Sequence, residues 1–396
     1  MVKVAIVRAV RTAIGSFGGV LREFSADQLA TVLIQNIVES TRIQPHSISE
    51  VILGQVYSSG CGMNPARIAT IKSGLPNHVP ATLVNQVCGS GLKSIIHATE
   101  SIMLDDTKII LAGGMESMSS VPFMVNGPRW GNKLGHLEMR DLLLQDGLTD
   151  AFHNYHMGVT AENIARKYAI SRTDQDLFAY QSQQRYHRAQ SQLAFQDEIV
   201  PVPLSNPKKH SKTKFDLDEH PRPSVTLDSL AQLNPVFEDG GSVTAGNSSG
   251  INDGASIVMM MSEATAKRLD LDVLAYVKAY ANIGLDPQYM GLGPVYAIRQ
   301  LMQKNDLDLS EIDLFELNEA FAAQSLAVIS ELSINPEKVN VHGGAIALGH
   351  PLAASGTRIS TTLLHLMKRK ELRYGLASLC VGGGMGIAIL FECPEH

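Results

Sequence analysis

The sequence predicts an α/β protein that is built from two similar halves. Apolar runs typical of strands alternate with amphipathic runs at helical spacing up to about residue 115, and again from about residue 255 onward. This alternation is typical of layered α/β folds. A stretch rich in proline and glycine, with few long apolar runs, interrupts it. Because 396 residues exceed the usual size of one core, we expect two or three domains.

The elements of the first half follow one another in a βα order. We expect a strand over 2–7, a glycine-rich turn, a helix with Ser25 as N-cap and Gln28 completing a capping box, a strand over 51–56, a helix over 65–72 and a strand over 108–112.

The interrupting segment, from Glu116 to about Asn247, reads as a large insertion. One helix is expected near Thr160, and a second is capped by Ser171 or Thr173. The second helix carries Gln, Arg, Tyr and His on a broad polar face, which predicts exposure to solvent. The proline-rich stretch 201–223 predicts an extended surface loop.

The second half repeats the order of the first. We expect strands over 255–261, 273–281, 312–317, 375–381 and 386–391, with helices after Pro294, through Phe321 and Ile329, and over 354–367. Three short matches are collinear between the halves: 49–53 with 310–314, 90–93 with 355–358, and 113–115 with 383–385. Together they indicate a duplicated domain.

Composition and charge exclude several classes of protein. The net charge of −6 is spread along the chain without acidic or basic blocks, which argues against nucleic acid or a membrane surface as partner. Four cysteines without Cys-x-x-Cys spacing predict neither a disulfide framework nor a metal site. Neither a signal peptide nor a run of about 20 apolar residues is present, so we expect a cytoplasmic protein.

Cys88 is the first candidate nucleophile. It lies between a β-prone run at 81–84 and a helical pattern that begins at Leu92. The partial positive charge of a helix N-terminus is expected to favour its thiolate, and Gly89 and Gly91 leave room for other groups. The alternative is a cysteine buried as a small hydrophobic residue.

Two other stretches are equally dense in glycine and small residues. One contains His350 and the other begins at Cys380. The duplication predicts that these corners lie together with the Cys88 corner. Each also has a purely structural interpretation, because a glycine-rich loop is commonly a tight connection and Asn318 could simply cap a helix. Cys61 and Cys393 lack such surroundings and are expected to be inert.

Taken together, the motifs resemble the thiolase family over nearly the whole chain, and within it the acetyl-CoA acetyltransferases. They are NQVCGSG at 85–91, GGMESM at 113–118, YHMG at 155–158, VTAGN at 243–247, NEAF at 318–321, GGAIALGHP at 343–351 and CVGGGMG at 380–386. The resemblance implies a five-layered α/β/α/β/α core of two βαβαβαββ halves plus a loop domain. It divides the chain into an N-terminal half (1–118 and 247–269), a loop domain (119–246) and a C-terminal half (270–396).

The resemblance also implies the chemistry. Cys88 would carry an acyl group, His350 would take its proton, and the N–H groups of Cys88 and Gly382 would bind the oxyanion. Cys380 would remove the α-proton of a second acetyl-CoA, and the enolate would be held by His350 and by a water that Asn318 fixes.

By the same resemblance, coenzyme A thioesters are substrates, and neither a prosthetic group nor a metal is expected. The expected contacts with coenzyme A are Leu148, His156, Met157, Arg222, Ser249, Met290, Ala320 and Phe321. Arg222 could instead be a solvated arginine of the proline-rich loop. Two positions depart from the family pattern: Ala353 stands where glycine is usual and His342 where asparagine is common.

The activity implied is condensation of two acetyl-CoA to acetoacetyl-CoA and CoA, within fatty acid metabolism. The alternatives are a degradative 3-ketoacyl-CoA thiolase for longer chains and a catalytically silent relative. His156 before Met157 favours the short-chain type, and the presence of all the reacting side chains disfavours the silent one. The resemblance further implies a homotetramer, with 121–135 as the docking loop.

Overall fold

Ten strands form one sheet within the described residues, 2–204 and 213–394, of this computed structural model. The strands are β1 (Val4–Arg11), β2 (Gly15–Ser16), β3 (Glu50–Gly54), β4 (Ala81–Val84), β5 (Ile109–Ser117), β10 (Asn252–Ser262), β11 (Ala275–Gly284), β12 (Leu314–Leu317), β13 (Tyr374–Val381) and β14 (Met385–Glu392). Their order is β12-β13-β14-β11-β1-β10-β5-β3-β4, with β2 beside β10. The halves join between β1 and β11, where Ala5 pairs with Tyr276 and Ile6 with Ala275.

The two halves have the same topology. In the N-terminal half β4, β3 and β5 are parallel, and β10 and β1 follow in antiparallel pairing. In the C-terminal half β12 and β13 are parallel, and β14 and β11 are again antiparallel. A parallel bridge from Phe315 to Val339 takes the place of the β3–β4 pair. The predicted duplication is therefore confirmed.

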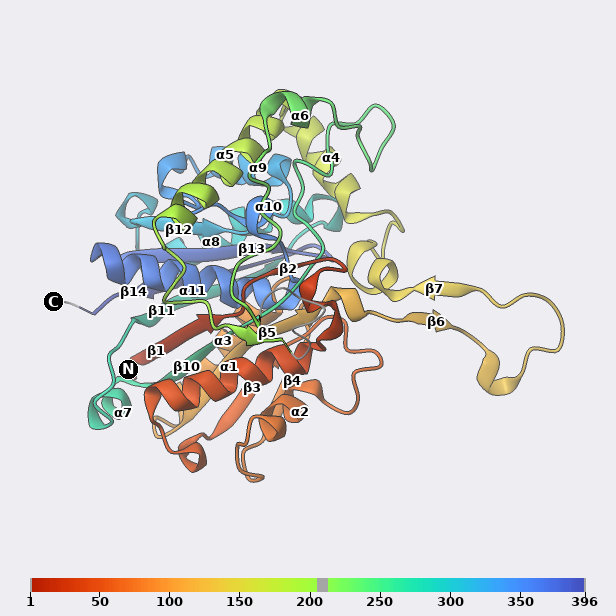
Figure 1. The fold of residues 1–396 in the computed structure, drawn as a ribbon. Coiled ribbons are helices and arrows are strands. Elements are labelled where there is room, and N and C mark those ends of the chain that lie inside the picture. Colours follow the sequence, from red (N-terminus) through yellow and green to blue (C-terminus); the bar gives the residue numbers. More distant parts are fainter. Residues whose placement is uncertain (1, 205–212, 395–396) are drawn as a thin grey trace.

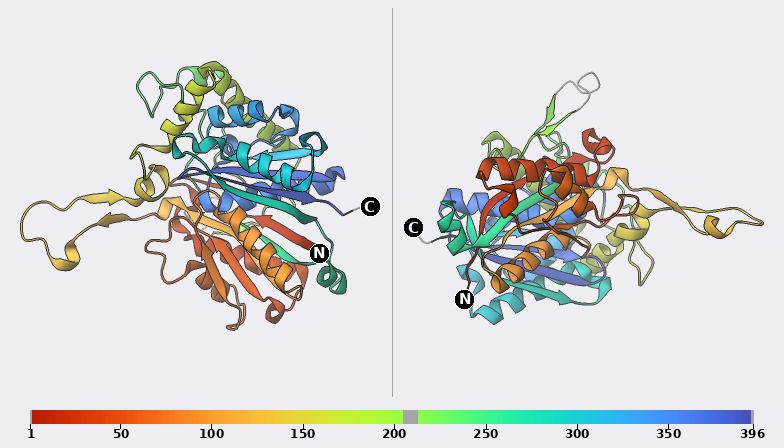
Figure 2. Two further views of the ribbon diagram at one scale, coloured as in Figure 1. Left: turned by 180° about the vertical axis from the view of Figure 1, so that it is seen from behind. Right: turned by 90° about the horizontal axis from the view of Figure 1, so that it is seen from below.

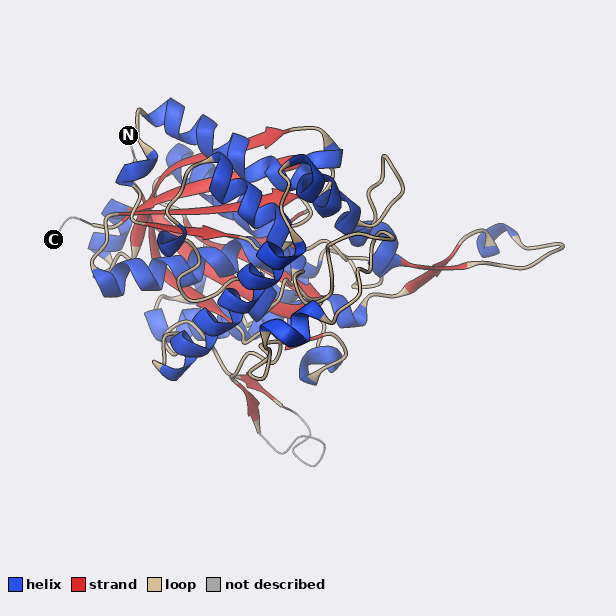
Figure 3. Ribbon diagram, turned by 90° about the horizontal axis from the view of Figure 1, so that it is seen from above, coloured by secondary structure: helices blue, strands red, loops and turns tan. Residues whose placement is uncertain are grey.

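Helices cover both faces of each half-sheet, which gives the predicted five layers (Figures 1 and 3). One outer layer contains α1 (Ala26–Thr41) and α2 (Pro65–Lys72), and the other contains α8 (Gly293–Asn305) and α9 (Ala322–Glu331). The middle layer is α3 (Ser90–Leu104) with α11 (Leu352–Lys370). Apolar side chains of α3 and α11, such as Ile95 and Leu363, pack with residues of both half-sheets.

The middle helices approach closely through two glycines. A Cβ at Gly91 would lie 2.5 Å from the carbonyl oxygen of Ala353, and one at Gly356 would lie 2.6 Å from the backbone nitrogen of Leu92. Neither position has room for a side chain. Because Cys88 and His350 each lie two residues before the start of α3 and α11, this contact places the two corners together.

Capping agrees with the sequence at both expected sites. Ser25 and Gln28 form a capping box at α1. Ser171, rather than Thr173, caps α5 (Arg172–Ser191) together with Asp174.

One of the three sequence matches between the halves does not join equivalent positions. The glycines at 113–114 lie inside β5, whereas those at 383–384 lie in the turn after β13.

The insertion contains the helices α4 (Met157–Lys167), α5 (Arg172–Ser191) and α6 (Leu227–Ala231) and two short hairpins. Strands β6 (Phe123–Val125) and β7 (Met139–Asp141) form an arm that projects from the body (Figures 1 and 2). Strands β8 (Val202–Pro203) and β9 (Lys214–Phe215) form the second hairpin. Two further short helices, α7 (Glu263–Arg268) and α10 (Ala345–Leu348), lie in the core halves.

Two predictions for the insertion are wrong in part. The polar face of α5 is not simply solvated, because Gln175, Asp176 and Gln183 are buried and hydrogen-bonded. The stretch 201–223 is not only a surface loop, since buried Asp218 accepts hydrogen bonds from Arg11. Residues 205–212 of that stretch lie outside the described part.

No helix in 2–204 or 213–394 is long and apolar enough to cross a membrane.

Candidate active site

Cys88 lies in a tight turn between β4 and α3, as predicted. Val87 before it has a φ of 46°, an unusual conformation for a β-branched residue. Polar contacts hold the turn: Val87 N–H donates to Asn85 Oδ1 (2.9 Å), and Ser90 Oγ accepts from Gln86 N–H (2.9 Å) and donates to the Val87 carbonyl (2.6 Å). The cysteine is thus held in one orientation at the start of the central helix.

A single cavity of about 850 Å³ brings together nearly all the predicted site residues. Its lining includes twelve of them: Cys88, Leu148, His156, Met157, Arg222, Ser249, Met290, Ala320, Phe321, His350, Cys380 and Gly382. The remaining one, Asn318, lies just behind the wall at the end of β12, with its Nδ2 3.4 Å from Nε2 of His350. Residues from both halves and from the insertion therefore meet in one place.

The position of His350 is determined by three contacts. Its backbone N–H donates to Oδ1 of Asn252 (2.9 Å), and Nδ1 of its ring lies 2.6 Å from Oγ of Ser355. The third is the contact of Nε2 with Asn318. Glu319, next to Asn318, accepts from Ser182 (2.7 Å) and from the N–H of Ile346 (3.1 Å), which fixes the strand end that carries Asn318.

Burial governs the protonation of the site. It raises the pKa of the Cys88 thiol to about 11, although the N–H groups of Gly382 and of Cys88 itself act in the opposite direction. It also raises the pKa of Cys380, with Cys88 as a second cause. Burial, and then the charge of Arg358, lowers the pKa of His350 to about 3. The resting site thus holds two thiols and a neutral imidazole.

The helix N-terminus alone therefore does not make Cys88 a thiolate in the resting protein. The N–H groups do favour the thiolate, as expected, but removal from water disfavours it more strongly. A thiolate at Cys88 requires a base that takes its proton.

The insertion supplies one wall of the cavity. His156 stacks on Phe237 with ring centroids 4.6 Å apart, and Phe237 meets Phe321 edge to face. The N–H of Ser249 donates to the Ala320 carbonyl (3.0 Å), which joins this wall to the end of β12. Arg222 lines the same cavity, and its N–H donates to Oε1 of Gln183 on α5 (3.0 Å).

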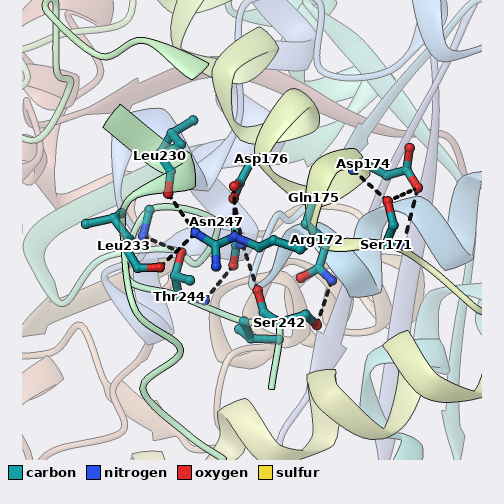
Figure 4. Close-up of polar contacts among 12 residues, drawn as sticks. Ser171, Arg172, Asp174, Gln175, Asp176, Leu230, Leu233, Ser242, Thr244 and Asn247 are labelled. Atoms are coloured by element: carbon teal, nitrogen blue, oxygen red, sulfur yellow. Dashed lines mark hydrogen bonds and ion pairs between the residues drawn. The ribbon is translucent and has the colours of Figure 1, made fainter. Parts of the chain in front are cut away.

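Figure 4 shows how the segment before Ser249 is held against α5. Nδ2 of Asn247 donates to Asp176 (2.9 Å), and its Oδ1 accepts from the N–H of Thr244 (2.8 Å). Asp176 in turn accepts from Arg172 (2.8 Å), whose guanidinium also reaches the carbonyl of Leu230 (2.6 Å). The polar residues of α5 therefore form a buried support for the cavity wall.

Sequence reasoning missed the residues that join the N-terminal turn to this wall. The Glu219 carboxylate accepts from the N–H groups of Ser16 (2.9 Å) and Val20. Ser16, Phe17, Glu219 and His220 all line the cavity. No local motif marks these residues, since Ser16 and Val20 meet Glu219 from about 200 positions away. A group of His, Cys, Asp and Glu side chains suited to a metal is not found among the residues that the structure describes.

Comparison with known families shows to which family the chain belongs. The N-terminal domain of thiolase matches residues 4–264, and the C-terminal domain of thiolase matches residues 271–393. The chain belongs to the thiolase family, and the protein is a transferase of that family.

Individual relatives extend over the full chain. The acetyl-CoA acetyltransferase of Chromobacterium violaceum is 51% identical over 392 residues, which are 99% of this chain and 100% of the relative. The crystal structure of the Bacillus anthracis acetyl-CoA acetyltransferase superposes with a TM-score of 0.96 and 42% identity, covering 100% of this chain and 99% of the other. The crystal structure of human mitochondrial 3-ketoacyl-CoA thiolase in complex with CoA superposes with a TM-score of 0.95 and 40% sequence identity, covering 100% of this chain and 98% of the other.

Proposed function

We propose that the protein catalyses the reversible condensation of two acetyl-CoA to acetoacetyl-CoA and CoA through an acetyl group carried on Cys88. The observation that carries this proposal is the joint presence of two thiols, a neutral imidazole and the Gly382 N–H in one cavity. A thiol-to-thioester exchange is nearly balanced in energy and divides a difficult condensation into two easier steps. The relatives named acetyl-CoA acetyltransferase support the choice of acyl group.

In the first half-reaction, His350 takes the Cys88 proton and the thiolate attacks the carbonyl of acetyl-CoA. The N–H groups of Cys88 and Gly382 stabilise the oxyanion, consistent with their action on the Cys88 pKa. The bond between the carbonyl carbon and the CoA sulfur then breaks. The leaving sulfur takes a proton from Cys380, so that CoA departs as a thiol and Cys380 becomes a thiolate.

In the second half-reaction, the Cys380 thiolate removes an α-proton from a second acetyl-CoA. Burial suits Cys380 for this task, because a raised pKa makes its thiolate a stronger base. The enolate oxygen is held by the His350 imidazolium and by a water on Asn318. The enolate carbon attacks the acetyl group on Cys88, and the released Cys88 thiolate recovers its proton from His350.

Coenzyme A carries the acyl group, supplies no catalytic group and is itself released as a product. No prosthetic group takes part in the proposed reaction. We assign its pantetheine arm to the cavity wall formed by Leu148, His156, Met157, Ser249, Met290, Ala320 and Phe321, and a polar contact near the mouth to Arg222. The hydrogen bond from the Arg222 backbone to Gln183 fixes this loop at the cavity, while the residue itself is exposed. We also propose that the loop domain spans 119–246, between the two parts of the N-terminal half, and that the C-terminal half begins after residue 269.

A degradative 3-ketoacyl-CoA thiolase is the second candidate, and the likeness to the human mitochondrial enzyme of that name supports it. Thiolysis rates across acetoacetyl-CoA and 3-ketoacyl-CoA substrates of six to sixteen carbons, each measured as kcat/KM, separate the two. We expect the highest value for acetoacetyl-CoA. A maximum at eight carbons or more would replace acetyl specificity with the degradative function and leave the family assignment unchanged.

For assembly, we propose a homotetramer in which the arm that contains β6 and β7 mediates docking. Its exposed apolar residues, among them Phe123, Trp130 and Leu134, support this proposal. Light scattering at micromolar concentration is expected to give four times the 42.8 kDa chain mass; a stable monomer would contradict it.

We also propose that the protein acts in the cytoplasm and in fatty acid metabolism. The four free cysteines support the location, and the thioester substrates support the metabolic role.

A further inference from the structure

Ser355 makes the shortest polar contact of the His350 ring. It lies in the first turn of α11 and is buried, and its Oγ is 2.6 Å from Nδ1 of His350. The same Oγ donates to the carbonyl of Pro351 at 3.1 Å. The two residues are only five positions apart in the sequence.

The two contacts of Ser355 decide which nitrogen of His350 carries the proton. A serine hydroxyl has one proton to donate. The Pro351 carbonyl can only accept, so a hydroxyl proton directed at it leaves Oγ to accept from His350, which makes Nδ1 the protonated nitrogen. The lone pair then lies on Nε2, where the Nδ2–H of Asn318 approaches at 3.4 Å. Both sides of the ring thus indicate the same tautomer.

We propose that Ser355 is a positioning residue that holds His350 as the Nδ1–H tautomer and keeps its Nε2 ready to accept the Cys88 proton. The proposal rests on the proposed role of His350 as the base for Cys88. Ser355 need not reorganise during the reaction, because Nδ1–H donates to Oγ both in the neutral ring and in the imidazolium. The same hydrogen bond would therefore stabilise the charged ring that forms when Cys88 is deprotonated.

The helix provides a matched control for the test. Ser360, also buried on α11, donates to the carbonyl four residues before it, Gly356, at 2.9 Å. It therefore repeats the helix contact of Ser355 without a histidine partner. Ser355→Ala and Ser360→Ala each remove a buried hydroxyl from the same helix, and only the first removes the contact with His350.

The readout is the rate of Cys88 alkylation by iodoacetamide between pH 6 and 10, which needs no acyl substrate. In Ser355→Ala we expect the rate at pH 7 to fall at least about tenfold and its midpoint to move to higher pH, because general-base assistance is commonly worth about 10²- to 10⁴-fold. In Ser360→Ala we expect a change of less than about twofold. Ser355→Thr, which keeps the hydroxyl, should restore most of the rate.

Equal alkylation profiles for Ser355→Ala and wild type would overturn the proposal. Should Ser355→Ala fail to fold, neutron diffraction from deuterated wild-type crystals decides the question, because it locates the proton directly. A deuteron on Nδ1 directed at Ser355 supports the assignment, and one on Nε2 alone refutes it. Neither measurement depends on acyl-chain preference, so a failure of acetyl specificity is distinguishable from a failure of this inference.

Discussion

The two halves of the core share strand order and direction, but they carry different chemistry at equivalent corners. In the N-terminal half the turn before α3 holds Cys88. In the C-terminal half the corresponding turn before α11 holds His350, and the strand end of β13 adds Cys380. In the mechanism that we propose, the N-terminal half supplies the nucleophile, whereas the C-terminal half supplies the groups that move protons.

This difference shows which features of a duplicated fold can diverge. The contact between α3 and α11 restricts both helices to glycine at Gly91 and Gly356. The corner residues just before the helices face the cavity and are free of that steric limit. Duplication therefore brings two corners together, and the unlike residues at those corners line one shared cavity.

The largest expected effect separates the roles of the two cysteines. Cys88→Ala should abolish acetylation of the protein and lower turnover by more than about 10³-fold. In Cys380→Ser the nucleophile remains but the hydroxyl is a far weaker base, so exchange of label between acetyl-CoA and CoA should survive better than acetoacetyl-CoA synthesis. Peptide mass spectrometry after incubation with acetyl-CoA should place one acetyl group on Cys88.

Cys61→Ala is the matched control, because Cys61 is a free cysteine outside the cavity lining. It should leave both reactions within about twofold of wild type. An acetyl group found on Cys380 would reverse the assigned roles of the two halves.

The next effect concerns the contact between the halves. Gly91→Ala would place a Cβ 2.5 Å from the backbone oxygen of Ala353, so the helices must separate. We expect a loss of stability of about 3 kcal/mol, at the upper end for overpacking. An alanine elsewhere in a helix would instead add about 0.5–1 kcal/mol relative to glycine. Thermal unfolding monitored by circular dichroism measures the change.

Gly356→Ala tests the symmetry of this contact, because its Cβ would meet Leu92 at 2.6 Å. A similar loss in both variants supports a balanced helix pair. Met103→Ala, a partly exposed position of α3, serves as the control and should change stability by less than about 0.5 kcal/mol. Wild-type stability in Gly91→Ala would show that the helices can part without cost.

The sequence predicts the core, and the residues that gather in the cavity, well for a physical reason. Strands, helices and glycine corners such as 85–91 leave local patterns, and the family resemblance covers the whole chain. Side-chain partners across long separations leave no such pattern. The pairing of Arg11 with Asp218, and of Glu219 with Ser16 and Val20, could not be predicted from either partner alone.

Two features that the sequence does not show have the same origin. The polar face of α5 predicts exposure because composition cannot reveal that Asp176 meets Asn247 in the interior. The helix N-terminus that favours the Cys88 thiolate is visible in the sequence, whereas the burial that outweighs it is not. Polarity predicts exposure only where no buried partner exists.

The smallest expected effect concerns Glu116, which links the two halves beneath the cavity. Its buried carboxylate accepts from the N–H groups of Val56 and Tyr57 in the N-terminal half and of Ala353 in the C-terminal half, at 3.0–3.1 Å. Burial raises its pKa from 4.5 to about 7, although these donors act in the opposite direction. The folded protein therefore holds this proton up to about pH 7, whereas the unfolded chain releases it near pH 4.5.

Stability associated with the protonated form is accordingly lost as the pH rises from about 4.5 to 7. Glu116→Gln cannot ionise, so the free energy of unfolding of wild type relative to this variant should fall by about 2.5 kcal/mol between pH 5 and pH 8, with most of the fall below about pH 7. Urea unfolding at pH 5, 6, 7 and 8 measures the difference. Glu39→Gln, on the exposed face of α1, should show no such trend. A difference that rises with pH would mean that the three N–H donors outweigh burial and that the link between the halves works as a permanent carboxylate.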